Sequence, residues 1–271
     1  MIFTNQRKIK GIESFDPKVC NQSIERKSVA RFLGVLIDEK LNWSHHILAL
    51  KQKISRYVGI FYKLKNQLPL ASRLNLFQAH IQSHLNYCSL IWGFSCKSNI
   101  ESIFTVQKKA MRAVMPGYIN YYYKEGIAPT HTKQAFAKYK IPTVHNIITK
   151  NAILFMLKTF KFKFCLPPSI CQLIPDNVPT PSSTYDDPET VVWTSTYNTS
   201  HFRASLFFKG PLSYAEIISQ IKPNHNTLPS HKTTIKTFLH NVQSTGDSQE
   251  WTAGNFKLFN PKGLRQSKRN D

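Results

Sequence analysis

The chain has 271 residues, of which 41 % are hydrophobic, so it can bury a packed core and is not expected to be wholly disordered. It carries 36 lysines and arginines against 15 acidic residues, a formal net charge of +21. This excess favours a polyanionic partner, and the 12 % of aromatic residues, which can stack on bases, favours nucleic acid over an anionic membrane surface.

The cysteine pattern predicts a reducing compartment. The chain has five cysteines, an odd and small number, and its first residues lack the hydrophobic leader that is typical of secretion. We therefore expect an intracellular protein with free thiols that is not secreted. The most apolar run, Ala152 to Leu157, is too short to cross a bilayer, so no membrane contact is expected.

Residues 1 to 40 have the pattern of β structure. Two short strands are expected on either side of a tight turn at Asn21-Gln22. A longer strand is expected from Val29 to Ile37, with Gly34 in its middle. A glycine inside a strand indicates a bulge or the close approach of another backbone.

Three amphipathic helices are expected next, over about 41–68, 70–90 and 99–115, because apolar residues recur there at steps of three and four. Ser44 can cap the first helix, and Gly93 marks the stop after the second. The stripes expected to be buried are Ile47, Leu50, Ile54, Val58, Phe61 and Leu64; Leu70, Leu74, Phe77, Ile81 and Leu85; and Ile100, Ile103, Phe104, Gln107, Met111 and Val114.

A short helix is expected near 132–140, followed by a turn in which Thr143 caps a long helix that continues to about residue 163. The composition then changes to a stretch rich in proline, serine and threonine, which predicts a linker or a long loop. Beyond it we expect a short strand at 190–194, small helices near 212–221 and 231–241, and a basic disordered tail.

These elements together predict a mainly α fold with a small N-terminal β-hairpin region, an α+β class. A helical bundle is followed by a Pro-rich, loosely ordered C-terminal region. A lone two-stranded hairpin is marginal in water, so the N-terminal part is expected to fray.

The predicted helices between residues 45 and 112 are strongly basic, and Glu101 is the only acidic residue there. A helical bundle with one apolar and one basic face suits contact with a nucleic-acid backbone that does not depend on base sequence. The alternative is a basic face that is only solvated. The candidate nucleic-acid-binding residues are Lys51, Lys53, Arg56, Lys63, Lys65, Lys108, Lys109 and Arg112.

Several phrases stand in a specific order along the first 165 residues. Phe32-Leu33-Gly34-Val35 is followed by Asp38, Trp43 and His46; Leu85-Asn86-Tyr87-Cys88 is followed by Ile91-Trp92-Gly93; Gln107-Lys108-Lys109-Ala110-Met111-Arg112 and Tyr139-Lys140-Ile141-Pro142-Thr143-Val144 come after them. This order resembles the carboxy-terminal part of the reverse transcriptase of non-LTR (LINE/jockey-like) retrotransposons. From residue 166 onward the likeness fades.

The resemblance implies a division of the chain and a partner. Phe32, Leu33, Gly34 and Val35 would form the primer grip, the hairpin that presses the growing 3′ end toward the active site. The partner would be template–primer nucleic acid, an RNA–DNA hybrid, RNA or DNA, in the nucleus or the cytoplasm. The implied segments are 1–40, end of palm and primer-grip-like hairpin; 41–118, thumb-like bundle; 119–165, helical connecting segment; 166–200, Pro/Ser-rich linker; 201–245, small helical region; and 246–271, basic disordered tail.

The resemblance also implies that the catalytic residues lie elsewhere. Polymerisation with two metal ions needs carboxylates, which this family supplies from an aromatic-x-Asp-Asp turn before the primer grip. Tyr185-Asp186-Asp187 is similar in letters, but Thr184 stands two positions before Asp186 and the motif follows the grip. We therefore expect no catalytic residue, metal site or cofactor in this chain and no activity of the chain alone; magnesium is expected only for the complete polymerase.

Three further patterns resemble functional sites, but we favour a structural interpretation for each of them. His80 and His84 have the spacing of a zinc protease, but Ile81 stands where the catalytic glutamate would be, so a solvated helix face is expected. Cys165 and Cys171 lack a second ligand pair and are expected to be core thiols. Tyr121-Tyr122-Tyr123 is expected to lie half in the core, with base stacking as the alternative.

Two other functions remain open from the sequence. The chain could be an inert product of a truncated retroelement copy, with no partner. It could also be a fragment of a longer, active polymerase, which an upstream aromatic-x-Asp-Asp turn in the same reading frame would indicate.

Overall fold

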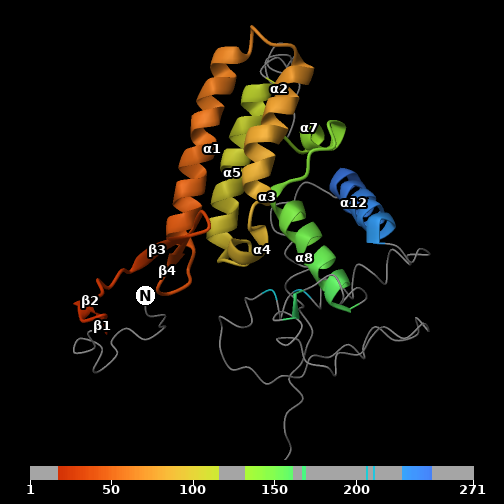
Figure 1. Cartoon of the computed structure of the whole chain (residues 1–271). Coiled ribbons are helices and arrows are strands. Elements are labelled where there is room, and N and C mark those ends of the chain that lie inside the picture. Colours follow the sequence, from red (N-terminus) through yellow and green to blue (C-terminus); the bar gives the residue numbers. More distant parts are fainter. Residues whose placement is uncertain are drawn as a thin grey trace, which may run out of the picture.

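The computed structural model describes residues 18–115, 132–160 and 228–245, together with Pro167, Pro168, Leu206 and Gly210. These parts are mostly helical, with two small antiparallel strand pairs near the N-terminus, which confirms the predicted α+β class (Figure 1). The predictions that lie outside the described residues are the Tyr121-Tyr122-Tyr123 run, the linker with Tyr185-Asp186-Asp187, the two cysteines Cys165 and Cys171, the strand at 190–194, the helix near 212–221 and the basic tail.

The first strand pair is a minimal hairpin. Strand β1 (Lys18–Val19) pairs with β2 (Gln22–Ser23), and the turn consists of Cys20 and Asn21. Both turn residues have positive φ, 49° and 61°, as a two-residue turn with the twist of a hairpin requires. The turn therefore lies one residue earlier than the predicted Asn21-Gln22.

The second strand pair lies beside the start of the helical bundle. Strand β3 (Val29–Phe32) pairs with β4 (Val35–Asp38), so that Leu33 and Gly34 form the turn, with φ of 46° and 81°. The single strand predicted from Val29 to Ile37 is therefore two strands with a turn at Gly34 and no bulge, which agrees with the hairpin that the resemblance implies here. A two-residue hairpin turn needs positive φ at both positions. Leu33 provides it at the first position and Gly34, which adopts it without steric cost, at the second.

Helices α1 (Ser44–Leu64) and α5 (Lys97–Val114) pack side by side and run in the same direction (Figure 1). A hydrogen bond from the Asn99 amide to the Asn42 carbonyl oxygen, 3.2 Å, joins them near their first residues. The chain returns between them through α2 (Leu70–Phe77), the π-helical turn η1 (Gln78–Gln82), α3 (Ser83–Asn86) and the short α4 (Ser89–Trp92). The bundle core therefore lies among these segments.

The helix predicted over about 70–90 is helical from Leu70 to Asn86, with a π-helical turn inside it, and ends a few residues earlier than expected. Tyr87 is extended and Cys88 has φ of 49°, which separates α3 from α4. The Trp92 indole N–H donates to the Tyr87 carbonyl oxygen at 2.9 Å, and Trp92 is fully buried. A buried tryptophan N–H needs a hydrogen-bond partner, and this bond stabilises the break between α3 and α4. The spacing of apolar residues gives no information on such a bond.

The predicted apolar stripes are largely confirmed. All six predicted residues of α5 are buried, as are Ile47, Leu50, Ile54 and Phe61 on α1. The predicted Thr143 cap is also confirmed, because the Asn146 N–H donates to Thr143 Oγ1 at 3.4 Å at the start of α8 (Val144–Phe160).

Two more helices complete the described part of the fold. Helix α7 (Thr132–Lys138) packs on α5, and α12 (Leu228–Thr245) packs on α7 and α8. Ile235 and Leu239 of α12 form a small second core with Ile153, Met156 and Leu157 of α8.

Candidate nucleic-acid interface

The candidate basic residues on α1 are spread around the exposed side of this helix. Lys53, Arg56, Lys63 and Lys65 are exposed and Lys51 is half-buried. Arg56 and Lys63 each follow a buried core residue by two positions, about 200° around the helix, so they point away from the bundle. Lys51 and Lys53 lie on opposite sides of α1, because a separation of two residues corresponds to a rotation of about 200° around the helix axis.

Most of the surface of α5 is buried in the core, and the candidate residues lie on the narrow face of this helix that remains outside it. Lys109 and Arg112 are exposed, whereas Lys108 is half-buried with Nζ 4.5 Å from the centroid of the Phe104 ring. Helices α1 and α5 run in the same direction side by side (Figure 1), and each carries exposed or half-buried basic side chains.

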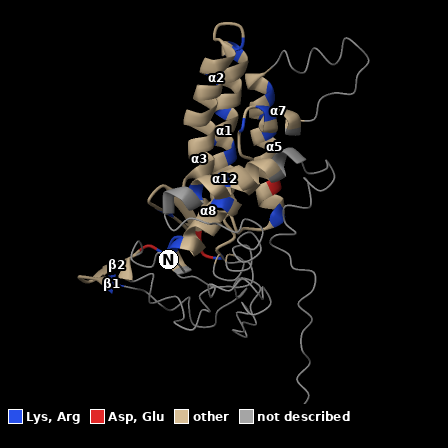
Figure 2. Cartoon of the chain, turned by 90° about the vertical axis from the view of Figure 1, so that its right-hand side faces the viewer, with Lys and Arg blue, Asp and Glu red and all other residues tan. Residues whose placement is uncertain are grey.

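Acidic residues are scarce over this surface. In the part of the chain that the structure describes, they are Glu25, Asp38, Glu39 and Glu101. Glu101 alone lies on a helix, and it faces His145 of α8 at 3.3 Å. Lysines and arginines recur along the helices, while acidic segments are few (Figure 2). Among the described residues, Glu101 is therefore the one acidic residue on a helix that offsets part of the positive charge of α1 and α5.

The primer-grip-like residues lie at the tip of the β3–β4 hairpin and divide into two groups. Phe32 and Leu33 point into solvent, with 64 % and 74 % of their surface exposed, whereas Val35 is buried. Gly34 is exposed in the turn. Two large apolar side chains at a hairpin tip make an exposed apolar surface, which is typical of a contact site.

The base of this hairpin is fixed to α1 by Asp38. Its carboxylate accepts the backbone N–H groups of Lys40, Asn42 and Trp43 at 3.1, 2.9 and 2.8 Å. The residue before α1 is Trp43, in the left-handed region with φ of 63°, and no side chain caps the helix. The prediction of Ser44 as the cap was therefore wrong; the carboxylate orders the chain just before the helix instead.

His46 makes a second connection between the hairpin and the bundle. Its Nδ1 accepts the Leu36 N–H at 3.4 Å, and its ring lies 6.2 Å from that of Trp92. Burial lowers the pKa of His46 below the ordinary value of 6.5, which favours the neutral imidazole that this hydrogen bond requires.

Sequence reasoning missed the role of Tyr87. Its hydroxyl donates to the Leu33 carbonyl oxygen at 2.6 Å, and its ring lies 3.8 Å from the point where a Cβ at Gly34 would be. The break between α3 and α4 therefore contacts the hairpin tip directly. The phrase Leu85-Asn86-Tyr87-Cys88 drew attention to this position in the sequence, but nothing in its spacing indicated that Tyr87 contacts Leu33.

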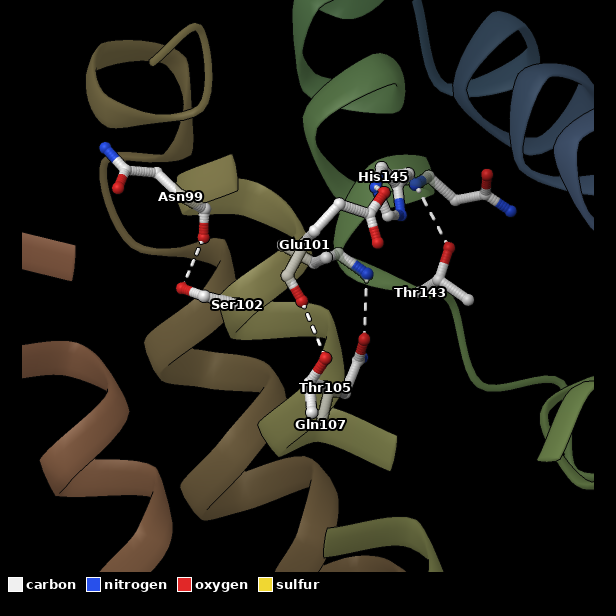
Figure 3. A network of polar contacts seen from close by, with 9 residues as sticks. Asn99, Glu101, Ser102, Thr105, Gln107, Thr143 and His145 are labelled. Carbon is white, nitrogen blue, oxygen red and sulfur yellow. Dashed lines mark hydrogen bonds and ion pairs between the residues drawn. The ribbon is translucent and has the colours of Figure 1, made fainter. Parts of the chain in front are cut away.

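A buried polar network stiffens the junction of α5 and α8 beneath this surface (Figure 3). The Gln107 side chain, fully buried, donates to the Pro142 carbonyl oxygen at 3.1 Å and accepts the Val144 N–H at 2.9 Å. The neighbouring His145 imidazole holds the pKa of Glu101 below its ordinary value of 4.5, and Lys108 and Lys97 act in the same direction.

His80 and His84 do not lie on the solvated face that we predicted. Both are half-buried, and their rings lie against Tyr57 of α1, with centroid distances of 4.7 and 5.9 Å. No group of three metal-ligating side chains occurs within the described residues. No described helix is both long enough and apolar enough to cross a membrane.

Comparisons with known proteins point to polymerases of mobile elements. The chain is 28 % identical over 94 residues to the probable RNA-directed DNA polymerase from transposon X-element of Drosophila melanogaster. It is 26 % identical over 95 residues to the RNA-directed DNA polymerase from mobile element jockey of the same species. Each match covers 34 % of this chain and 10 % of the relative, so the likeness spans about a tenth of those proteins.

Two other comparisons gave no match. No family model matches the chain, and no solved structure matches it. The relationship to RNA-directed DNA polymerases of mobile elements is therefore a distant one, carried by about a third of the sequence.

Proposed function

We propose that this chain corresponds to the primer-grip and thumb region of a non-LTR retrotransposon reverse transcriptase, and that it binds template–primer nucleic acid through α1 and α5. It has no catalytic aspartates of its own in this proposal and is inactive alone. The likeness to polymerases of mobile elements supports the coarse kind of partner.

The observation that carries the proposal is the basic surface of α1 and α5 next to an exposed apolar hairpin tip. Helices α1 and α5 pack side by side with exposed or half-buried lysines and arginines, and Glu101, the one described acid on a helix, faces His145. Such a surface suits phosphate contacts that are independent of sequence. Phe32 and Leu33 would contact the nucleic acid from the end of the bundle where β4 joins α1.

The test is the salt dependence of binding. The purified chain is titrated with a labelled RNA–DNA hybrid at several salt concentrations, with double-stranded DNA as competitor. Each phosphate that is neutralised contributes about 0.9 to the slope of log affinity against log salt, so several contacts give a steep slope. Absence of binding near physiological salt would contradict the proposal and favour a folded product without a nucleic-acid partner.

Charge-reversal variants locate the surface. One variant combines Lys51→Glu on α1 with Lys109→Glu and Arg112→Glu on α5, and a second combines Arg56→Glu and Lys63→Glu on the outward face of α1. Each lost contact should lower the salt slope by about 1. Lys232→Glu on α12, an exposed lysine of a different helix, is the matched control and should leave the slope unchanged.

A further inference from the structure

The contact between α1 and the returning η1–α3 segment contains an aromatic and basic cluster, of which the candidate interface includes only Lys53. The Tyr57 ring stacks on the His80 ring, with centroids 4.7 Å apart and planes at 18°, and it also contacts the His84 ring at 5.9 Å. Lys53 stands one turn before Tyr57 on the same helix. All three rings are half-buried and Lys53 is exposed, so the cluster opens to solvent.

This arrangement of side chains follows from the antiparallel packing of α1 and the η1–α3 segment. Lys53 and Tyr57 are one turn apart on α1, and His80 and His84 are four residues apart on the opposing segment, so Lys53 lies opposite His84 and Tyr57 opposite His80. His80 belongs to the π-helical turn, an element that is frequent at functional sites. The neighbours Ile81 and Leu85 are fully buried and hold this segment in the core, while the two imidazoles lie against Tyr57.

The charges around His84 are all positive or neutral. Burial lowers the pKa of His84 below 6.5, and Lys53 and His80 add to the effect. Helix α8, which also packs on α3, contributes the uncharged Asn151, whose amide donates to Asn86 at 2.9 Å. No described acid lies on α1, η1 or α3. An anion bound at this cluster would therefore meet no described acidic side chain on these elements, and it would favour protonation of the imidazoles.

We propose that Lys53, His80 and His84, with Tyr57 as an aromatic wall, bind one phosphate group of a nucleic-acid backbone and take up a proton on binding. The proposal rests on the proposed nucleic-acid function and adds to it a specific, pH-dependent contact. A protonated imidazole and an ammonium group can both donate charge-assisted hydrogen bonds to phosphate oxygens. An uncharged imidazole forms only the weaker, neutral kind of hydrogen bond to a phosphate oxygen.

The expected sign follows from proton uptake. Because the bound phosphate favours the imidazolium form, affinity for the hybrid must rise as the pH falls. One proton taken up corresponds to about a tenfold change in affinity per pH unit, so we expect about a three- to tenfold rise between about pH 7.5 and about pH 6. The measurement is the anisotropy of a labelled RNA–DNA hybrid at constant ionic strength with the full chain.

Two variants separate this site from general effects of pH. The double variant His80→Gln with His84→Gln should bind the hybrid but lose most of the pH dependence. His45→Gln, at an exposed histidine on α1, is the control and should keep it. The single variant His84→Gln serves as the second test if the double variant is unfolded by circular dichroism; it should also weaken the pH dependence. An unchanged pH dependence in the folded variant overturns the site and leaves the proposed function intact.

A separate measurement covers failure of the proposed function. If the hybrid does not bind at any pH, the pKa of His84 is measured by imidazole NMR with and without inorganic phosphate. A pKa that rises with phosphate supports an anion site that is independent of nucleic acid, and an unchanged pKa overturns the site as well.

Discussion

The Tyr87 hydroxyl donates a hydrogen bond of 2.6 Å to the Leu33 carbonyl oxygen, and it thereby joins the break between α3 and α4 to the tip of the β3–β4 hairpin. A two-stranded hairpin is marginal by itself in water. This hairpin is held at its base by Asp38 and His46 and at its tip by Tyr87. The position of Phe32 and Leu33 relative to the helices therefore depends on a few polar contacts.

Tyr87→Phe should loosen the hairpin tip. The variant removes one hydrogen bond at an exposed site, so we expect a loss of about 0.5–1 kcal/mol in the free energy of unfolding. Amide hydrogen exchange near Leu33 and Gly34 should become faster. Tyr62→Phe, at an exposed tyrosine on α1, is the control and should change neither quantity. Equal exchange in the wild type and the Tyr87 variant would show that the hairpin base alone holds the tip.

Asp38→Ala should destabilise the junction before α1. Three backbone N–H groups lose their acceptor, and we expect a loss of about 1–3 kcal/mol in urea unfolding. Glu39→Gln is the neighbouring control, because the Glu39 carboxylate lies 3.8 Å from Arg26 in an exposed ion pair worth at most about 1 kcal/mol. Similar losses in both variants would contradict the role that we assign to Asp38.

Gly93→Ala and Gly59→Ala should have opposite effects on stability. A Cβ at Gly93 would lie 2.8 Å from Ile148 Cγ1, so α4 and α8 would have to separate, and we expect a loss of about 1–3 kcal/mol. Gly59 lies inside α1 with open space around it, and alanine there should add about 0.5–1 kcal/mol through helix propensity. Thermal unfolding of both variants checks the pair; a stabilised Gly93 variant would rule out the close contact.

The stability of the folded chain should fall as the pH decreases below about 6.5. The pKa of His46 is lowered in the folded state from an ordinary value of 6.5, so its contribution is present above that value and is lost as protonation begins in the unfolded chain. His84 acts in the same direction. His46→Gln should reduce the decrease of Tm between about pH 7 and about pH 5. An identical pH profile for this variant would show that His46 does not contribute.

The local parts of the fold could be predicted from the sequence. Buried stripes on α1 and α5 and the Thr143 cap depend on residues within a few turns of each other, and periodicity reports such relations directly. The same reasoning failed at Gly34 and Ser44. At Gly34 the sequence allowed a bulge or a hairpin turn, and the pairing of β3 with β4 decided for the turn. Before α1 it allowed a Ser44 cap or the Asp38 carboxylate, and the contact of Asp38 with Trp43 is the one that forms.

The sequence by itself determined the mainly helical class, the basic character of α1 and α5 and the exposed or half-buried state of their lysines and arginines, because charge and periodicity are properties of single segments. The tertiary structure alone decided that Tyr87 contacts Leu33, that the helix breaks at Cys88, and that Tyr57 stacks on His80. Each of these joins elements that are distant in the chain, and their geometry depends on how buried side chains such as Trp92 and Ile81 pack in the shared core.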